Sequence, residues 1–248
     1  MRTRDLKVLM LAAAALGAAS APPALAASDG WDWAVAPYLW ATTISTDAEI
    51  GGQPVGSEAS FSDIVDKLDF AFLLHAEGQG EQFGLMADYI YLGVSDDSSR
   101  TRMSVDASLD TTIFELAGVW SPGDERFSGF EAFAGLRYLN PELDLKFDLD
   151  DPALADQRRT LDKAFTDAMV GARYTAELSD RWGVVLRADA SFGETEGGYN
   201  ASAIFQYHTG SGMWALGYRY LSIELETGSG ESLDLTMNGP IVGYAFKF

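Results

Sequence analysis

Asp, Glu and Arg residues recur inside segments in which apolar residues alternate with small or polar ones. These side chains could form ion pairs, bind ions or transfer protons. At about 3.3 Å per residue of extended chain, several lie at a similar distance from the nearest short turn, so they are predicted to share one depth. Isolated charges there would be costly, but the fork of an Arg guanidinium suits bidentate pairing with a carboxylate. Three interpretations follow: a structural salt-bridge network, a selectivity constriction for small solutes, or a catalytic group. The residues concerned are Glu77, Asp88, Glu115, Glu131, Arg137, Arg173, Arg187, Asp189 and Arg219, with Asp167 on the same face.

The chain has two histidines, His75 and His208, and either would have to serve as the base if the protein were a serine hydrolase. A serine hydrolase needs a His within reach of its nucleophile and a third group that orients the base. Ser202 shares the predicted face of His208 but lies six residues away along the strand, and no short His-x-Ser pair occurs. Proteolysis by carboxylates alone would need clustered acids at the outer rim of a barrel. Asp96, Asp97 and Asp106 are predicted to lie there, but acidic residues in solvated loops are common. We expect no enzymatic activity.

An acidic segment, "NPELDLKFDLDDPALAD", offers the oxygen ligands that Ca²⁺ or Mg²⁺ prefers. Its spacing does not match the twelve-residue calcium loop, because the required Gly and closing Glu are missing. We expect no metal site and no cofactor here. Divalent cations that bridge lipid phosphates remain a possible weak role for its acids, Glu142, Asp144, Asp148, Asp150, Asp151 and Asp156.

The N-terminus predicts export. Basic residues precede the apolar run "VLMLAAAALGAA", and Ala24-Leu25-Ala26 supplies a small-x-small cleavage signal. We therefore expect residues 1–26 to be a cleaved signal peptide and residues 27–248 to form one domain. The formal net charge of −20 argues against nucleic-acid binding, and the absence of Cys excludes a disulfide framework. No later segment has about 20 consecutive apolar residues, which would be needed for an inner-membrane helix.

Period-two alternation dominates the mature chain and predicts an all-β fold. Short turns alternate with longer connections, including expected long loops at 45–68 and 142–162, and "FSDIVDKLDF" in the first loop could form a helical turn or two. In "MSVDASLD" we expect a bulge or a segment above the membrane. An even number of strands would place both termini on the short-turn side. Ten strands are predicted, at 31–44, 69–80, 83–95, 103–120, 129–141, 163–178, 182–193, 199–208, 213–226 and 234–248.

One face of each clear strand is apolar, with aromatic residues towards its ends, and the other is polar or glycine. A soluble sandwich or a lipocalin-like barrel would turn the apolar face inward. Strands of about ten residues and bracketing aromatics instead favour a membrane barrel whose apolar face points outward. The chain also stops on the apolar parity, in the expected periplasmic girdle, and we predict that its last alternating residues form an insertion signal: Val242, Tyr244, Phe246 and Phe248.

The ordered fragments "WAVAPYLWA", "FGLMADYIYLGVS", "FAGLRYL", "LGYRYLSIE" and "NGPIVGYAFKF" resemble strands of Gram-negative outer-membrane β-barrel proteins of the opacity-protein-like group. The resemblance implies an antiparallel up-and-down transmembrane β-barrel in the outer membrane. It also implies partners: outer-membrane lipid and lipopolysaccharide, the barrel insertion machinery and periplasmic chaperones. Many such barrels have eight strands, so eight is the alternative to ten. The resemblance implies no particular activity.

Together these features predict a barrel with a structural or surface role whose interior, or lumen, is closed at mid-height. Long Arg side chains drawn across the axis by opposing carboxylates would fill a barrel only slightly wider than an eight-stranded one. A small passive channel is the first alternative, and a barrel enzyme is the second.

Overall fold

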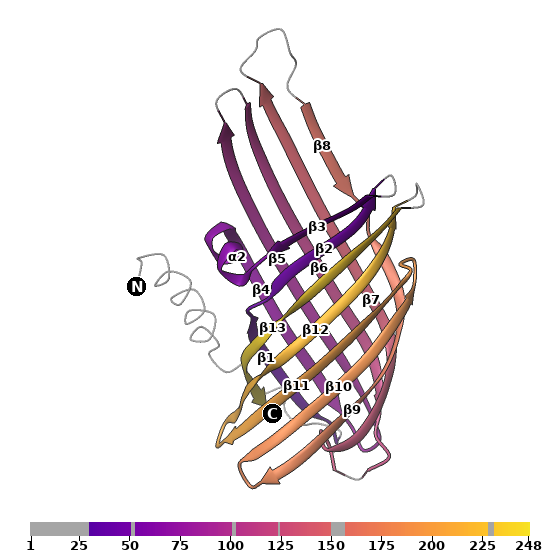
Figure 1. Cartoon of the computed structure of the whole chain (residues 1–248). Coiled ribbons are helices and arrows are strands. Elements are labelled where there is room, and N and C mark those ends of the chain that lie inside the picture. The colour runs from indigo at the N-terminus through magenta and orange to yellow at the C-terminus, as the bar shows by residue number, and fades with distance from the viewer. Residues whose placement is uncertain (1–29, 51–52, 101–102, 124, 150–156, 228–230) are drawn as a thin grey trace.

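The computed structural model describes residues 30–50, 53–100, 103–123, 125–149, 157–227 and 231–248 (Figure 1). The predicted signal peptide, 1–26, lies outside these residues and stays a prediction. Among the described residues no helix is both long and apolar enough to cross a membrane. The elements are β1 (Asp32–Trp40), β2 (Thr43–Ile50), β3 (Gln53–Ala59), α2 (Phe61–Lys67), β4 (Leu68–Gln79), β5 (Phe83–Arg100), β6 (Met103–Trp120), β7 (Gly129–Leu149), β8 (Gln157–Asp162), β9 (Phe165–Ser179), β10 (Trp182–Gly193), β11 (Gly197–Thr209), β12 (Gly212–Thr227) and β13 (Glu231–Lys247).

The strands close into a ten-stranded antiparallel barrel, as predicted, and not into the alternative of eight. β1 and β2 are successive parts of one crossing, because β13 pairs with both. β8 and β9 likewise pair with successive parts of β7. The barrel closes where β1 pairs with β13 on one side and with β4 on the other. β3 is an additional strand that forms a hairpin with β2.

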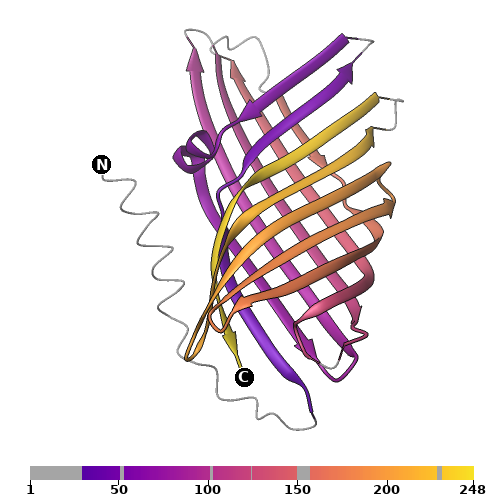
Figure 2. The ribbon, with the colours of Figure 1, turned by 60° about the horizontal axis from the view of Figure 1, so that its bottom comes forward.

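The connections at the end that holds both described termini are short, whereas the strands at the opposite end extend well beyond the barrel (Figures 1 and 2). The expectation of long loops at 45–68 and 142–162 was wrong. The first range holds β2, β3 and α2, and the second holds the end of β7 and β8. Outside the membrane both faces of a strand can be polar, so the alternation that reveals a strand disappears while its backbone ladder continues.

Two local expectations concern single segments. "MSVDASLD" in β6 pairs with β5 and β7 without a register shift, so the bulge is absent and the other alternative, a segment above the membrane, remains. "FSDIVDKLDF" does contain a helix, α2. Ser60 begins it with a capping box, because its hydroxyl accepts from the Asp63 amide while the Asp63 carboxylate accepts from the Ser60 amide. These bonds from Ser60 hold the pKa of Asp63 below its ordinary value.

The outward face of the barrel is apolar, as predicted. The side chains of Trp182, Leu186, Trp214 and Leu216 are 46–60% exposed, whereas the inward-facing Glu131 is fully buried. Aromatic pairs join neighbouring strands on the outer wall, among them Trp182 with Tyr207 and Trp214 with Tyr244. A soluble barrel would place its apolar face inside and its charges in water, so this orientation indicates a surrounding hydrocarbon phase.

Candidate functional site: the charged layer of the lumen

The nine charged residues of the candidate site are buried or nearly buried, and ion pairs and hydrogen bonds link them across the lumen; we call this set the charged layer. Strict alternation puts them on the inner face, and the ladder register sets their height. Asp88 pairs across to Glu115, and Glu115 pairs to Arg137. Arg173 stands opposite Arg187 on the next strand. The side chains of Arg173 and Arg187 are 11% exposed, and the other seven residues of the layer are more deeply buried.

Glu115 is the centre of this layer, because its carboxylate accepts from three guanidinium groups. Arg137 Nη2 lies 2.8 Å from its Oε1, and Arg219 Nη2 lies 3.0 Å from the same oxygen. Arg187 Nη2 lies 2.7 Å from Oε2. These arginines come from β7, β10 and β12, so a single carboxylate of β6 draws side chains from across the lumen.

Asp189 of β10 is a second meeting point on the same side. Its Oδ1 accepts from Arg137 at 2.6 Å, and its Oδ2 accepts from Arg187 Nε at 2.8 Å. The Asn200 amide, which is also buried, donates to Oδ2 at 2.7 Å and accepts from Arg219 Nε at 2.8 Å. Charge-assisted bonds of this length are the strong class of hydrogen bond, so the group is tightly held.

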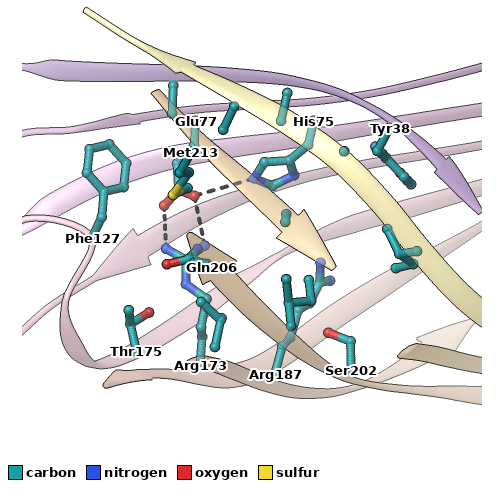
Figure 3. A pocket seen from close by; sticks show the side chains of 18 of the residues that line it. Tyr38, His75, Glu77, Phe127, Arg173, Thr175, Arg187, Ser202, Gln206 and Met213 are labelled. Carbon is teal, nitrogen blue, oxygen red and sulfur yellow. Dashed lines mark hydrogen bonds and ion pairs between the residues drawn. The ribbon is translucent and has the colours of Figure 1, made fainter. Parts of the chain in front are cut away.

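Arg173 binds the remaining glutamates. Its Nε donates to Glu131 at 2.6 Å. Its Nη1 donates to Glu77 Oε2 at 2.7 Å, and a further contact joins Nη2 to Glu77 Oε1 (Figure 3). The Gln79 amide donates to both glutamates. Glu77, Gln79 and Glu131 are each at most 4% exposed, so this cluster is shielded from bulk water.

His75 is held between two carboxylates. Its Nδ1 lies 3.2 Å from Asp88, and its Nε2 lies 3.4 Å from Glu77. The Tyr38 hydroxyl donates to Asp88 at 2.7 Å, and Arg219 approaches the same carboxylate at 3.5 Å. A general base needs one ring nitrogen free to take a proton from a nucleophile. Both nitrogens of His75 face carboxylates in this structure.

Aromatic and apolar groups bound the charged layer above and below. The Arg219 guanidinium carbon lies 5.1 Å from the Trp40 ring, and that of Arg187 lies 5.0 Å from the Phe133 ring. Above, towards the extended strand ends, an apolar layer lies across the lumen. This layer consists of Trp40, Leu73, Ile90, Ile113, Leu139, Phe165, Leu221, Ile223, Leu225, Met237 and Ile241.

Below the charged layer a cavity of about 170 Å³ reaches towards the end with the short turns (Figure 3). Phe127, from the β6–β7 connection, lines it at that end. Its backbone has a φ of 56°, a conformation that is uncommon for a non-glycine residue. Its amide donates to Gln79 Oε1 at 2.5 Å, and Lys247 lies 5.6 Å from its ring. The connection is therefore tied to the charged layer and narrows the lumen from below.

Sequence reasoning missed several members of this site. Tyr38, Gln79 and Asn200 satisfy the outer oxygens of the network, and Trp40 and Phe133 cover its guanidinium groups. The inward parity of Asn200 and Gln79 was a usable signal. Phe127 gave none, because its position depends on how a turn folds back. Asp167 pairs with Arg137 in the ladder, but its carboxylate instead accepts from Thr195 and Ser191.

The acidic segment is described only in part. Residues 150–156 lie outside the described residues, and Glu142 is exposed in β7, where it accepts from Asn140 at 2.8 Å. Within the described part of the chain, no group of three His, Cys, Asp or Glu residues is placed to hold a metal ion.

The alternating residues Val242, Tyr244 and Phe246 of β13 lie on the outer face of the barrel. Val242 is 42% exposed, and the Tyr244 and Phe246 rings pack edge to face at 4.9 Å. Phe248 follows β13, yet its amide and carbonyl still exchange hydrogen bonds of 3.0 Å with Trp33 of β1. The last residue therefore takes part in closing the barrel.

The sequence matches no protein-family model and no curated protein. Solved structures of outer-membrane barrels are similar in architecture. The attachment invasion locus protein Ail of Yersinia pestis is 11% identical, covers 88% of this chain and 100% of its own, and has a TM-score of 0.40. The outer membrane protease OmpT of Escherichia coli is 9% identical, covers 91% and 99%, and has a TM-score of 0.45. Neisserial surface protein A is 11% identical, covers 89% and 100%, and has a TM-score of 0.31. Likeness at this level gives no information about activity.

The class of protein follows from this chain's own geometry. A closed antiparallel barrel with an apolar outer wall, aromatic pairs on that wall and a buried polar layer inside is the architecture of a Gram-negative outer-membrane β-barrel. Transmembrane strands and an outer-membrane location are therefore confirmed.

Proposed function

We propose that this protein is a closed outer-membrane barrel with a structural or surface role, and that its lumen does not conduct. The observation that carries the proposal is the charged layer. Glu115 draws Arg137, Arg187 and Arg219 across the lumen at 2.7–3.0 Å, and the apolar layer lies directly above it. A hydrated ion would have to displace paired charges and then cross an apolar layer.

Conductance in a planar bilayer tests the closed lumen. The wild-type protein should give near-zero current. Arg187→Ala and Arg219→Ala remove long side chains from the layer and are the variants in which a small current is expected first. Steady, large, ion-selective openings of the wild-type protein, shifted in selectivity by these changes, would promote a small passive channel to first place. The cavity of about 170 Å³ below the layer is the feature that favours that alternative.

Orientation can be tested by labelling, because the chain has no Cys of its own. Glu142 lies on the extended side of the barrel, and Ser211 lies in the short β11–β12 turn; both are exposed. In intact cells a membrane-impermeant maleimide should label Glu142→Cys, and it should label Ser211→Cys only after the outer membrane is permeabilised. The reverse pattern would rule out a surface role for the extended strands.

The proposed route to the membrane is export behind residues 1–26, followed by insertion that reads Val242, Tyr244, Phe246 and Phe248. Lipid, lipopolysaccharide, the insertion machinery and periplasmic chaperones are the proposed partners. N-terminal sequencing of protein recovered from the outer membrane should begin at Ala27. A mature chain that still begins at Met1 would contradict the cleaved leader.

We also propose that the charged layer has no catalytic role, because both nitrogens of His75 contact carboxylates. A hydrolase screen, with His75→Ala and His208→Ala as comparisons, addresses this point. Hydrolysis lost in His75→Ala but retained in His208→Ala would establish an enzyme.

A further inference from the structure

The barrel wall is interrupted beside the apolar layer of the lumen. The β1–β4 ladder ends at the pair Pro37 and Leu74. Beyond that pair the chain bends at residues 41–42 and continues as β2, which pairs with β13 and β3 instead of β4. Gly239 permits the bend, because a Cβ there would overlap the carbonyl oxygen of Ala41. In the described part of the chain, the edge of β4 above Leu74 thus has no strand beside it.

Helix α2 lies at this interruption. It contacts β2 on one side and β5 on the other, and both views place it where the β2–β3 hairpin separates from β4 and β5 (Figures 1 and 2). Ile64 of α2 is 5% exposed, whereas Phe61 is 43% exposed. The helix therefore covers the opening with side chains rather than sealing it with a backbone ladder.

A cavity of about 280 Å³ lies under α2 and extends to both faces of the wall. Its lining includes Leu39 and Val242, which face outward, together with their chain neighbours Trp40 and Ile241, which face the lumen. Ala71 of β4 also lines it. A cavity that touches both faces of the same strands passes through the wall at the interruption.

The outer mouth of this cavity lies within the apolar band of the wall. Leu216 and Val242 stand side by side there in the β12–β13 ladder. Towards the short turns the next outward pair is Trp214 with Tyr244, an aromatic pair, and Tyr218 lies on the other side. Outward residues in the middle of the apolar band face acyl chains, so hydrocarbon is the medium at the mouth.

The cavity offers nothing to a polar ligand. The Trp40 indole N–H donates to the Gly239 carbonyl at 3.2 Å, and the Thr42 hydroxyl donates to the Thr43 carbonyl at 3.1 Å. The buried side-chain atoms without a partner in the described structure, on Ser121 and Asn140, do not line it. An apolar cavity of about 150 Å³ already stays dry and binds benzene, so this larger one suits a hydrocarbon.

We propose that this cavity binds one acyl chain of a bilayer lipid, which enters sideways from the membrane between β1 and β4, beneath α2. The chain end lies against Trp40, and the lipid headgroup stays at the rim. The surrounding bilayer is the source because the mouth opens into its hydrocarbon. A free fatty acid from the aqueous phase would offer the same acyl chain, and the experiment separates this source from the bilayer.

Fluorescence quenching of Trp40 tests the proposal. The protein, with Trp40 kept and its other tryptophans replaced by Phe, is folded into vesicles of phosphatidylcholine with brominated acyl chains. Trp40 is 7% exposed, so an unoccupied cavity would leave it weakly quenched. Strong quenching is expected, and Ala71→Leu, which fills the cavity, should remove most of it. Ala71→Val should remove less.

Two controls separate the cavity from the wall. Ala36→Leu places the same substitution in the lower lumen cavity and should leave the quenching of Trp40 unchanged. A protein that keeps only Trp214, on the outer wall, should be quenched equally with and without Ala71→Leu. Each variant is first checked for folding by its heat-dependent mobility on a gel.

Equal quenching of Trp40 with and without Ala71→Leu would overturn the proposal, whether that quenching is strong or weak. In a second arm, brominated fatty acid is added to unbrominated vesicles. Quenching by the fatty acid without quenching by the phospholipid would overturn the bilayer as the source.

Discussion

The charged layer and the apolar layer above it fill the same lumen at adjacent heights and are equally buried. Arg137 and Glu131 are 2% and 0% exposed, and Ile113 and Ile223 are 0% and 1% exposed. The charged layer is held by directional bonds between specific partners, whereas the apolar layer is held by shape alone. The extent of burial therefore does not distinguish the two layers. They differ in that a lost apolar group can be compensated by neighbours of similar shape, whereas a lost charged group leaves its bonding partner unsatisfied.

This difference is also visible where each layer meets the wall. At the height of the charged layer β1 still pairs with β4, through Ala36 with His75 and Pro37 with Leu74. Beside the apolar layer the β1–β4 ladder stops, and side chains of α2 cover the opening. An apolar layer tolerates contact with hydrocarbon, but a buried charge does not tolerate an open side. The β1–β4 ladder is therefore interrupted beside the layer where an opening in the wall destabilises the fold least.

The largest effect is expected from Arg137→Ala, which removes one of the three guanidinium partners of Glu115 and one of the two of Asp189. Removing one partner of a buried ion pair costs about 3–5 kcal/mol in free energy of unfolding. Urea-dependent unfolding in lipid vesicles measures it. The matched control is Arg126→Ala, whose 3.0 Å pair with Asp32 is partly exposed and should be worth about 0–1 kcal/mol. A loss below about 1 kcal/mol for Arg137→Ala would mean that water, or the arginines that remain, satisfy Glu115 and Asp189 without Arg137.

In the apolar layer Ile113→Ala should cost about 2–5 kcal/mol, because it leaves a cavity where the side chain was fully buried. Ile113→Val should cost about 0.5–1.5 kcal/mol. The same unfolding assay applies. In the apolar layer the loss in free energy of unfolding should thus scale with the volume removed. In the charged layer the loss should instead depend on whether a bonding partner is removed. Equal losses for the two variants at Ile113 would contradict packing by shape.

An arginine introduced on the outer wall tests whether a charge is tolerated only where it has partners, as in the charged layer. Leu216→Arg places in the apolar band a residue type that the lumen holds at the charged layer. It should cost about 2–4 kcal/mol if Leu216 lies near the bilayer midplane. A cost near zero would place Leu216 at an interface and would also remove the hydrocarbon argument for the cavity mouth.

The smallest equilibrium effect is expected at the C-terminus, outside both layers. Phe248→Arg near an interface should cost at most about 1 kcal/mol of unfolding free energy. The yield of assembled barrel in cells should nevertheless fall much further than synthesis, because Phe248 bonds to Trp33 where the barrel closes and is the proposed insertion signal. Pulse labelling with a heat-modifiability gel measures this yield. An unchanged yield from Phe248→Arg, or from a chain that lacks Phe248, would refute the signal.

The sequence alone determined the wall. Alternation is a local property, so it identified ten crossings, the outward faces of strands such as 182–193, and the inward set of charges from Glu77 to Arg219. It failed for the polar strand extensions at 45–68 and 142–162, because a strand in water needs no apolar face. Only the α2 turn within them left a local signal, its capping residues.

The tertiary structure decided the partners. Arg173 meets Glu77 across 96 residues of sequence, and Arg219 meets Asp88 across 131, because barrel closure brings distant strands to one height. The placement of Phe127 beneath the lumen and the interruption between β1 and β4 depend equally on that closure. Side-chain direction is encoded residue by residue, whereas pairing across a lumen and gaps in a wall exist only after the first strand has met the last.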